Sequence, residues 1–201
     1  MTPAQADHAR ADTDPSDRYS EEGPAGLVLD TPMPADGAAL WRIARDSRVL
    51  DLNSSYSYLL WCRDYAATSI VARDTSGEPV GFITGYARPD APRTLLVWQV
   101  AVDERLRGKG VAAAMLDALT RRTGAALGVE AMETTITPDN TASDRLFTSF
   151  AERHGALVER EVLFDAALFP EDGHESELLY RIGPIGARDD EAPSLPGPAP
   201  V

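Results

Sequence analysis

A central apolar segment sets the pattern of this chain. Residues 95–102 are mainly large and β-branched, with Gln99 as their one polar member, which predicts a strand buried on both faces. A polar loop follows at 103–109. Apolar side chains then recur at helical spacing, at Val111, Ala112, Met115, Leu116 and Leu119, and a basic pair before Gly124 predicts the end of this helix. The segment therefore predicts a strand, a glycine-containing loop and a helix.

Hydrophobic periodicity predicts further elements on both sides of this segment. Before it we expect a strand at 27–30, a helix at 35–45, a helix from an N-cap among Asn53, Ser54 and Ser55 to about residue 62, and a hairpin of strands 68–73 and 80–87. After it we expect a strand at 132–137, a helix at 142–153 and two antiparallel strands at 158–164 and 177–182. This alternation predicts an α/β fold with a mixed central sheet flanked by helices.

Length and composition predict one domain with two tails. A chain of 201 residues is long enough for a single domain with an ample core. Residues 1–24 hold almost no large apolar side chain, and residues 184–201 are rich in Pro, Gly and Asp. Such segments cannot bury enough apolar surface to fold. We therefore predict disordered tails at 1–24 and 184–201 around one domain at 25–183.

Charge and cysteine content narrow the function classes. The formal net charge is −13, and the predicted domain stays acidic without its tails, which argues against binding of nucleic-acid phosphates. Cys62 is the sole cysteine and the three histidines lack metal-ligand spacing, so we predict no disulfide and no metal site. Without an apolar stretch of about 20 residues, or an apolar signal core, we expect a cytoplasmic protein that does not bind membranes.

The glycine-containing loop has the composition of an anion site. Gly108 and Gly110 allow backbone N–H groups of the loop and of the first helical turn to converge, and the helix dipole adds positive potential. Arg105, Arg107 and Lys109 add three cations in an otherwise acidic chain. A phosphate or diphosphate is the expected ligand, although an ordinary strand-to-helix connection is the simpler alternative.

Three phosphate-binding patterns can be compared with this loop. A P-loop requires Lys directly after its second Gly, whereas Lys109 precedes Gly110. The dinucleotide pattern Gly-x-Gly-x-x-Ala is formally present, but several residues separate it from the strand. The third pattern is Gln or Arg, two residues, Gly, one residue, then Gly or Ala, and 107–112 meets it. This loop resembles the acetyl-CoA loop of the GNAT acetyltransferase superfamily, and the order of predicted elements over about 27–183 is that of the GNAT fold.

Four separate stretches carry a narrower resemblance within that superfamily. Residues 45–65 with Thr68 and Ser69, 81–86, 96–102 and 173–179 resemble, in the same order, the L-2,4-diaminobutyrate acetyltransferases of ectoine biosynthesis. The resemblance implies transfer of the acetyl group of acetyl-CoA to the 4-amino group of L-2,4-diaminobutyrate. It further implies a cytoplasmic homodimer that serves the synthesis of the compatible solute ectoine.

The resemblance also implies cofactor-binding residues. A main-chain N–H near Val100 would face the thioester carbonyl, and Val100 and Val102 would hold the pantetheine arm through their main chain. Asn140 and Ser143 begin the next helix and are candidates for cofactor contact, although Asn140 reads equally well as an N-cap. Phe147 stands where many relatives carry a proton-donating Tyr, so another group, or water, protonates the thiolate, or the thiolate leaves unassisted. Phe147 could pack against the cofactor or in the core. The diphosphate would bind Arg107, Gly108, Lys109, Gly110, Val111 and Ala112.

Diaminobutyrate is a compact zwitterion with a second ammonium group, so its site requires carboxylates for the amines and donors for its own carboxylate. The resembling stretches supply Asp51, Tyr56, Trp98, His174 and Glu177. Without the resemblance, Asp51 would be a turn residue, and Tyr56 and Trp98 would be core aromatics. His174 would be an exposed loop residue and Glu177 a solvated strand residue. We expect Asp51 and Glu177 to anchor the two ends of the diamine. We expect Glu177 or His174 to accept the amine proton, directly or through water.

Three other functions stay open at this level. The chain could acetylate another small amine or amino acid on the same fold. It could be a nicotinamide-dependent oxidoreductase that uses Gly108, Gly110 and Ala113, or a non-catalytic sensor of acyl-CoA. Thiol release with different amines, thermal protection by NAD(P), and CoA binding without turnover would separate these possibilities.

Overall fold

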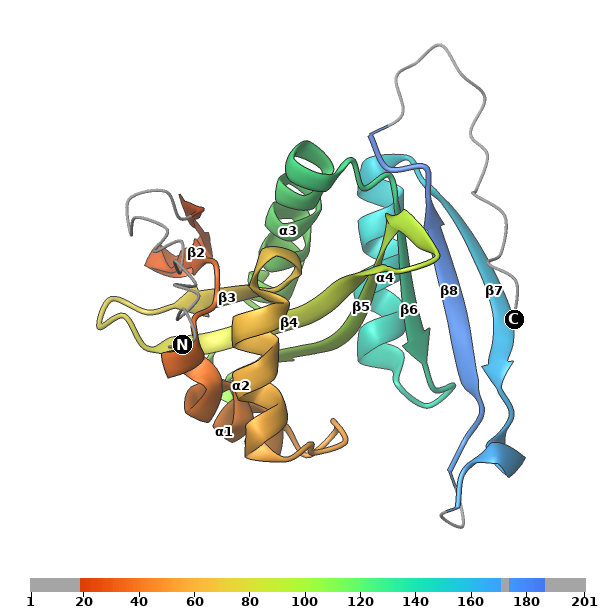
Figure 1. Cartoon of the computed structure of the whole chain (residues 1–201), viewed down its shortest axis with the longest axis horizontal. Helices are drawn as coiled ribbons and strands as arrows, with labels where there is room; N and C mark the ends of the chain where they lie inside the picture. The colour runs from red at the N-terminus through yellow and green to blue at the C-terminus, as the bar shows by residue number, and fades with distance from the viewer. Residues whose placement is uncertain (1–18, 171–173, 187–201) are drawn as a thin grey trace, which may run out of the picture.

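One sheet of eight strands organises the computed structural model, which describes residues 19–170 and 174–186 (Figure 1). The strands lie in the order β1-β2-β3-β4-β5-β6-β8-β7. β5 and β6 run parallel, and the other neighbouring pairs in the described part of the chain are antiparallel. The predicted mixed sheet is confirmed. Its strands are β1 (Ser20–Glu22), β2 (Val28–Asp30), β3 (Ile70–Arg73), β4 (Pro79–Arg88), β5 (Ala91–Val102), β6 (Ala131–Ile136), β7 (Leu157–Phe164) and β8 (Glu177–Gly183).

Helices flank this sheet, as predicted (Figure 1). They are α1 (Gly37–Ser47), α2 (Ser55–Asp64), α3 (Val111–Leu127) and α4 (Thr141–His154). Ser54 is the N-cap of α2, since its side chain accepts the N–H of Ser57. α1, α2 and α4 confirm the predicted helices to within two residues at each end.

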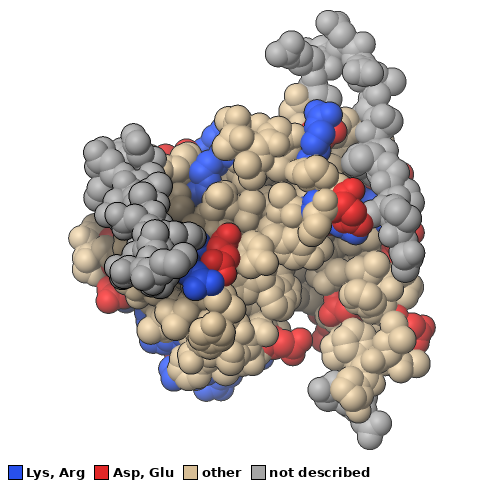
Figure 2. Space-filling view, in the orientation of Figure 1, with Lys and Arg blue, Asp and Glu red and all other residues tan. Residues whose placement is uncertain are grey.

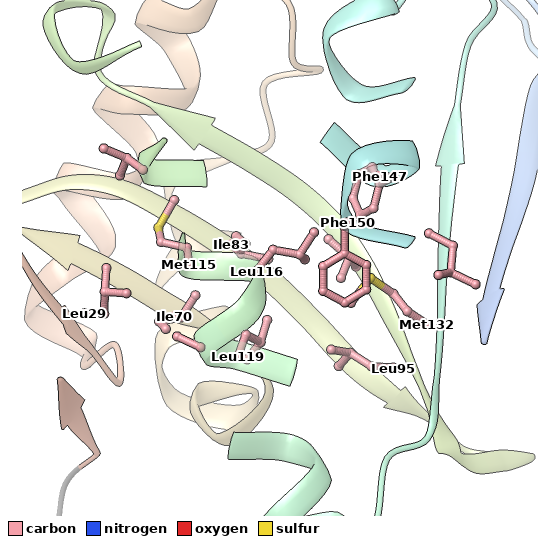
Figure 3. Packing of buried hydrophobic residues seen from close by; sticks show 14 of the residues in the cluster. Leu29, Ile70, Ile83, Leu95, Met115, Leu116, Leu119, Met132, Phe147 and Phe150 are labelled. Carbon is pink, nitrogen blue, oxygen red and sulfur yellow. The ribbon is translucent and has the colours of Figure 1, made fainter. Parts of the chain in front are cut away.

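Two core clusters lie on opposite faces of the sheet. The larger cluster joins α3 and α4 to the strands, and Figure 3 shows Leu116, Phe147 and Phe150 within it. The smaller cluster joins α1 and α2 to the strands through residues such as Val71. Because successive side chains of a strand point to opposite faces, Ile70 belongs to the first cluster and Val71 to the second.

The predicted end of α3 near Gly124 is wrong. The helix continues to Leu127 and ends at Gly128, whose φ of 68° lies in the left-handed region that favours glycine. The basic pair before Gly124 does not cap the helix. Arg121 pairs with Glu21 of β1, and Arg122 donates to the carbonyl of Ser69, so both side chains make tertiary contacts instead.

A β-bulge interrupts the pairing of β4 with β5. Thr84 pairs with Gln99 and Gly85 with Val97, which leaves Trp98 as the extra residue of β5. Gly85 permits this geometry. A Cβ at that position would lie 2.6 Å from the carbonyl oxygen of Leu96.

The folded domain extends beyond the predicted range of 25–183 at both ends. Ser20–Glu22, expected in the N-terminal tail, forms β1 and pairs with β2. Ile185, expected in the C-terminal tail, is buried, and its N–H donates to the carbonyl of Glu130 at 2.6 Å. Short polar segments gain these partners only from the folded sheet, so composition alone did not reveal them. The remaining parts of the predicted tails, 1–18 and 187–201, lie outside the described residues.

Candidate functional site

β5 and β6 diverge halfway along β5. Their parallel pairing extends from Thr94 with Ala131 to Val97 with Thr134. Beyond this point β5 continues beside β4, and β6 continues beside β8. The two strands therefore leave an opening at their carboxyl ends, which is the usual position of a ligand site in an α/β sheet.

The opening exposes main-chain groups of Val100 and Val102. The N–H of Asp103 donates to the carbonyl of Val80 on β4 at 2.8 Å. Ladder hydrogen bonds of an antiparallel pair alternate in direction along the strand. The N–H groups of Val100 and Val102 consequently point away from β4, toward the side from which β6 has diverged. These are the two main-chain positions predicted to meet the acyl group and the pantetheine arm.

The loop between β5 and α3 turns at two glycines. Gly108 and Gly110 have φ values of 74° and 77°, and a Cβ built at either would have no heavy atom within 4 Å. α3 begins without a capping side chain, and the first N–H to bond within this turn is that of Ala114, to the carbonyl of Gly110. The N–H groups of 111–113 are thus oriented for an external acceptor. Open space beside convergent donors fits a diphosphate group.

The three predicted cations differ in their partners. Arg105 lies between two carboxylates, 3.7 Å from Asp74 and 3.6 Å from Asp103. Arg107 donates from Nε to the carbonyl of Val102 at 3.3 Å, and Lys109 is exposed. In the described part of the chain neither Arg107 nor Lys109 pairs with a carboxylate. These two side chains therefore supply the positive charge of the loop.

Two predicted cofactor residues, Asn140 and Phe147, have structural roles in α4. Asn140 Oδ1 accepts the N–H of Ser143 at 3.1 Å, so Asn140 is an N-cap. Phe147 is 2% exposed and packs in the α3–α4 cluster, so it is a core residue (Figure 3). Contact of Asn140, Ser143 or Phe147 with a cofactor stays a prediction, and Phe147 has almost no free surface for it.

Three predicted substrate residues lie on the α2 side of the opening. Trp98 at the bulge is 47% exposed, and its ring centroid lies 4.8 Å from that of Trp61. Tyr56 in the first turn of α2 is also exposed, so neither aromatic is a core residue. Asp51 lies in the connection between α1 and α2 with an exposed side chain.

The other two predicted substrate residues lie at the start of β8. The side chain of Glu175 accepts the N–H of Asp139 at 3.2 Å, which holds this segment beside the turn that precedes α4. The ring of His174 stacks on Phe169, and its Nδ1 lies 2.6 Å from the carbonyl oxygen of Glu175. A carbonyl only accepts, so Nδ1 carries the proton and Nε2 of the neutral ring remains an acceptor.

The two groups of substrate residues do not converge. No hydrogen bond or ion pair within 19–170 and 174–186 joins His174 or Glu177 to Asp51, Tyr56 or Trp98. Figure 1 shows the start of β8 at the far end of the β7–β8 hairpin, apart from the connection between α1 and α2. In Figure 2 the surface is hollowed between these two parts, and acidic side chains border the hollow. This charge suits a diamine.

Gln99 also belongs to this region, although it is not among the predicted site residues. Its side chain is 5% exposed and lies between β5, α2 and the α1–α2 connection. Tyr58 donates to its Oε1 at 3.1 Å, and burial raises the pKa of Tyr58. The available signal was a single polar residue within an apolar strand, since a buried amide requires hydrogen-bond partners.

The described residues form neither a metal-binding cluster nor a membrane-spanning helix. In this part of the chain no group of three or more His, Cys, Asp and Glu side chains could hold a metal ion. Across 19–170 and 174–186 no helix has the length and apolarity to cross a membrane.

Comparison with known proteins gives relatives over most of the chain. A family model described as "Acetyltransferase (GNAT) family" matches residues 38–151. L-2,4-diaminobutyric acid acetyltransferase of Streptomyces anulatus is 64% identical over 92% of this chain and 99% of its own length. The protein of the same name from Streptomyces coelicolor is 69% identical over 81% of this chain and 96% of its own length.

Solved structures agree with this family. Diaminobutyrate acetyltransferase EctA from Paenibacillus lautus, in complex with L-2,4-diaminobutyric acid and coenzyme A, has a TM-score of 0.74. It is 41% identical and covers 81% of this chain and 96% of its own. A phosphinothricin acetyltransferase from Sinorhizobium meliloti, in complex with acetyl-CoA, shares the fold with a TM-score of 0.62 at 19% identity, over 84% of this chain and 93% of its own.

Proposed function

The chain belongs to the acetyltransferase (GNAT) family and, within it, to the L-2,4-diaminobutyric acid acetyltransferases, and from this membership we propose its reaction. It transfers the acetyl group of acetyl-CoA to the 4-amino group of L-2,4-diaminobutyrate. The carrying observation is 64% identity to a diaminobutyric acid acetyltransferase over nearly the whole of that relative. No other amine substrate is favoured by a specific feature of the site.

Bound acetyl-CoA supplies the thioester whose carbonyl carbon the amine attacks. In this proposal the N–H near Val100 donates to the carbonyl oxygen as negative charge develops there. Because β5 has left β6 at this point, this donor is available without breaking a ladder bond. The N–H groups of 111–113, with Arg107 and Lys109, would hold the diphosphate at the other end of the cofactor.

An ammonium group must lose a proton before it can attack. We assign this proton to His174 or Glu177, directly or through water. The support for His174 is its tautomer, since Nδ1 bonds to the carbonyl of Glu175 and Nε2 is left as the acceptor. In this proposal Asp51 and Glu177 supply carboxylates for the two amine ends from opposite sides of the hollow, with Tyr56 and Trp98 on the side of Asp51.

The proposal includes a homodimer. Val162, Leu163, Phe164 and Leu168, here called the β7 patch, are all exposed on the outer strand and the turn after it. An edge strand with exposed apolar side chains suits a protein contact, because covering such a surface removes it from water. A second copy of the chain is the occupant that the resemblance implies.

The proposal also places the reaction in the cytoplasm, within the synthesis of ectoine and the response to osmotic stress. This part rests on the resemblance in 45–65, 81–86, 96–102 and 173–179. Deletion of the coding gene should abolish the acetylated diamino acid in salt-stressed cells. Unchanged levels of that compound would contradict this physiological role.

Mass spectrometry of the product tests substrate, reaction and position together. The protein is incubated with acetyl-CoA and either diaminobutyrate, ornithine, lysine or a polyamine, and the acetylated nitrogen is located by fragmentation. We expect N4-acetyl-diaminobutyrate as the main product. Preferred turnover of another amine would replace the substrate assignment, and no turnover of any amine would refute the enzyme assignment.

A further inference from the structure

Gln99 joins the strand of the acyl site to the loop of the substrate site. Its neighbour Val100 carries the main-chain N–H assigned to the thioester carbonyl. Its own Nε2 donates to the carbonyl oxygen of Asp51 at 3.0 Å. The donor to the acyl group and a carboxylate for the diamine are therefore connected through one side chain.

Besides Gln99, the connection that carries Asp51 is held by Leu50, which packs against the smaller core cluster, and by the contact of Tyr58 with Asn53. It runs between α1 and α2 without regular structure, and Val49 and Leu52 within it are exposed. Its start is held by Ser47, whose Oγ accepts the N–H groups of Val49 and Leu50 at 3.4 Å. The main-chain carbonyl of Asp51 also accepts a longer contact, of 3.5 Å, from Nδ2 of Asn53. Of these two side-chain contacts to the carbonyl of Asp51, the one from Gln99 is shorter and comes from outside the connection.

The β-bulge brings Gln99 into this position. The extra residue at Trp98 changes the alternation of β5, so Gln99 points toward α2 together with Trp98. There the Oε1 atom of Gln99 accepts from Tyr58, so both ends of the buried amide are occupied. Because the bond from Tyr58 fixes the amide of Gln99, the amide in turn restrains the main chain of Asp51.

We infer that Gln99 is a positioning residue that sets Asp51 relative to the acyl site and so controls affinity for the amine substrate. It acts through Asp51 and does not itself touch the substrate, because its side chain is buried. This inference rests on the proposed function. It adds a specificity role to a residue outside the predicted site.

Two variants separate the bonds of Gln99. Gln99→Met removes both with an unbranched side chain of similar length. Tyr58→Phe removes the bond to Oε1 and keeps the bond to Asp51, but it also removes a contact with Asn53 of the same connection. Thr120→Val, which removes the buried hydrogen bond from Thr120 to the carbonyl of Leu116 in α3, is therefore the matched control. We expect Gln99→Met to raise KM for diaminobutyrate about tenfold. KM for acetyl-CoA should change less than about twofold, and Thr120→Val should leave both KM values within about twofold.

A double-mutant cycle tests the route of the effect. If Gln99 acts through Asp51, Gln99→Met should cause no further rise in KM for diaminobutyrate in an Asp51→Ala background. Gln99→Glu provides a second variant if Gln99→Met fails to fold, because its carboxylate can accept from Tyr58 but cannot donate to Asp51. Thermal unfolding is measured for every variant.

The outcomes are distinct. A wild-type protein that does not acetylate diaminobutyrate refutes the proposed function, whatever the variants do. A functional wild type with unchanged KM for diaminobutyrate in Gln99→Met or Gln99→Glu overturns the inference. Equal rises in both KM values, or additive effects with Asp51→Ala, would also overturn it, since they indicate a general structural role.

Discussion

At Gly85 the absence of a side chain allows the bulge that exposes Trp98. A Cβ at Gly85 would lie 2.6 Å from the carbonyl oxygen of Leu96 on β5 and 3.2 Å from that of Thr68, just before β3. Neither oxygen belongs to a flexible side chain. The orientation of Trp98, and with it the α2 side of the site, therefore depends on a glycine on the neighbouring strand.

Gly85→Ala should lower the free energy of unfolding by about 2 kcal/mol or more, because backbone atoms must move to accommodate the methyl group. Gly81→Ala is the control on the same strand. A Cβ there would lie 3.2 Å from the flexible end of Met115 and 3.3 Å from the carbonyl oxygen of Ala101, both farther than the 2.6 Å at Gly85, so we expect a smaller loss. Denaturant unfolding measures both. Equal losses would contradict the role assigned to the bulge.

Cys62 gives a second prediction at the residue scale. It is the sole cysteine of the chain, it is 1% exposed, and burial raises the pKa of its thiol to about 12. Since the thiolate is the reactive form, the folded protein should not react with Ellman's reagent at pH 8. One thiol should appear after denaturation. Rapid labelling of the native protein would show that the site around Cys62 opens.

At the scale of elements, the start of α3 combines turn geometry with an anion site. Gly110 is needed for its positive φ, and the space where its Cβ would lie is open. Gly77 has the same features in the turn between β3 and β4, with a φ of 85° and no heavy atom within 4 Å of a built Cβ. The two glycines differ in their proposed role, because the diphosphate is expected to bind beside Gly110 and not beside Gly77.

Gly110→Ala and Gly77→Ala should each lower the free energy of unfolding by about 1 kcal/mol, since both place a Cβ in the left-handed region. Only Gly110→Ala should raise KM for acetyl-CoA, by about tenfold, because its methyl group occupies the approach to the diphosphate. Steady-state kinetics with both variants tests this. An equal KM for acetyl-CoA in the two variants would argue against the loop as the diphosphate site.

The attachment of β1 to α3 predicts a pH dependence. Burial raises the pKa of the Glu21 carboxyl, but the hydrogen bonds from Arg121 and the proximity of Tyr19 together lower it by more, so the net pKa lies below its ordinary value. A lowered pKa stabilises the folded state above the unfolded-state pKa, and this contribution is lost as the pH falls through the folded-state pKa. Glu21→Gln should therefore lower Tm at pH 7 and have little effect near about pH 3. A Tm difference that is the same at both pH values would contradict the ion pair.

At the scale of the whole molecule, the β7 patch predicts assembly. Leu168 is 70% exposed in this patch, and Leu127, at the end of α3, is 45% exposed outside it. Leu168→Glu should shift the protein from dimer to monomer in sedimentation experiments, because a charge would be buried in the contact. Leu127→Glu is the control and should remain dimeric. A wild-type monomer would refute the homodimer, and a dimeric Leu168→Glu would place the interface elsewhere.

Local patterns in the sequence predicted most of the elements and the cofactor loop. Helical spacing, the N-cap at Ser54 and the glycines of 107–112 act over a few residues, so they are readable without the fold. The end of α3 was misjudged because Arg121 and Arg122, which resemble a helix end, bind distant partners instead. β1 was missed for the same reason, since three polar residues form a strand only when β2 lies beside them.

The sequence by itself determined the order of strands and helices from β2 onward, the glycine turn before α3, and the family resemblance of the four stretches. Tertiary structure alone decided where β5 leaves β6, that Trp98 is the extra residue of a bulge, and that Gln99 bonds to Asp51. Periodicity and turn chemistry depend on neighbours along the chain. Strand divergence, register and buried hydrogen bonds depend on residues that only folding brings together.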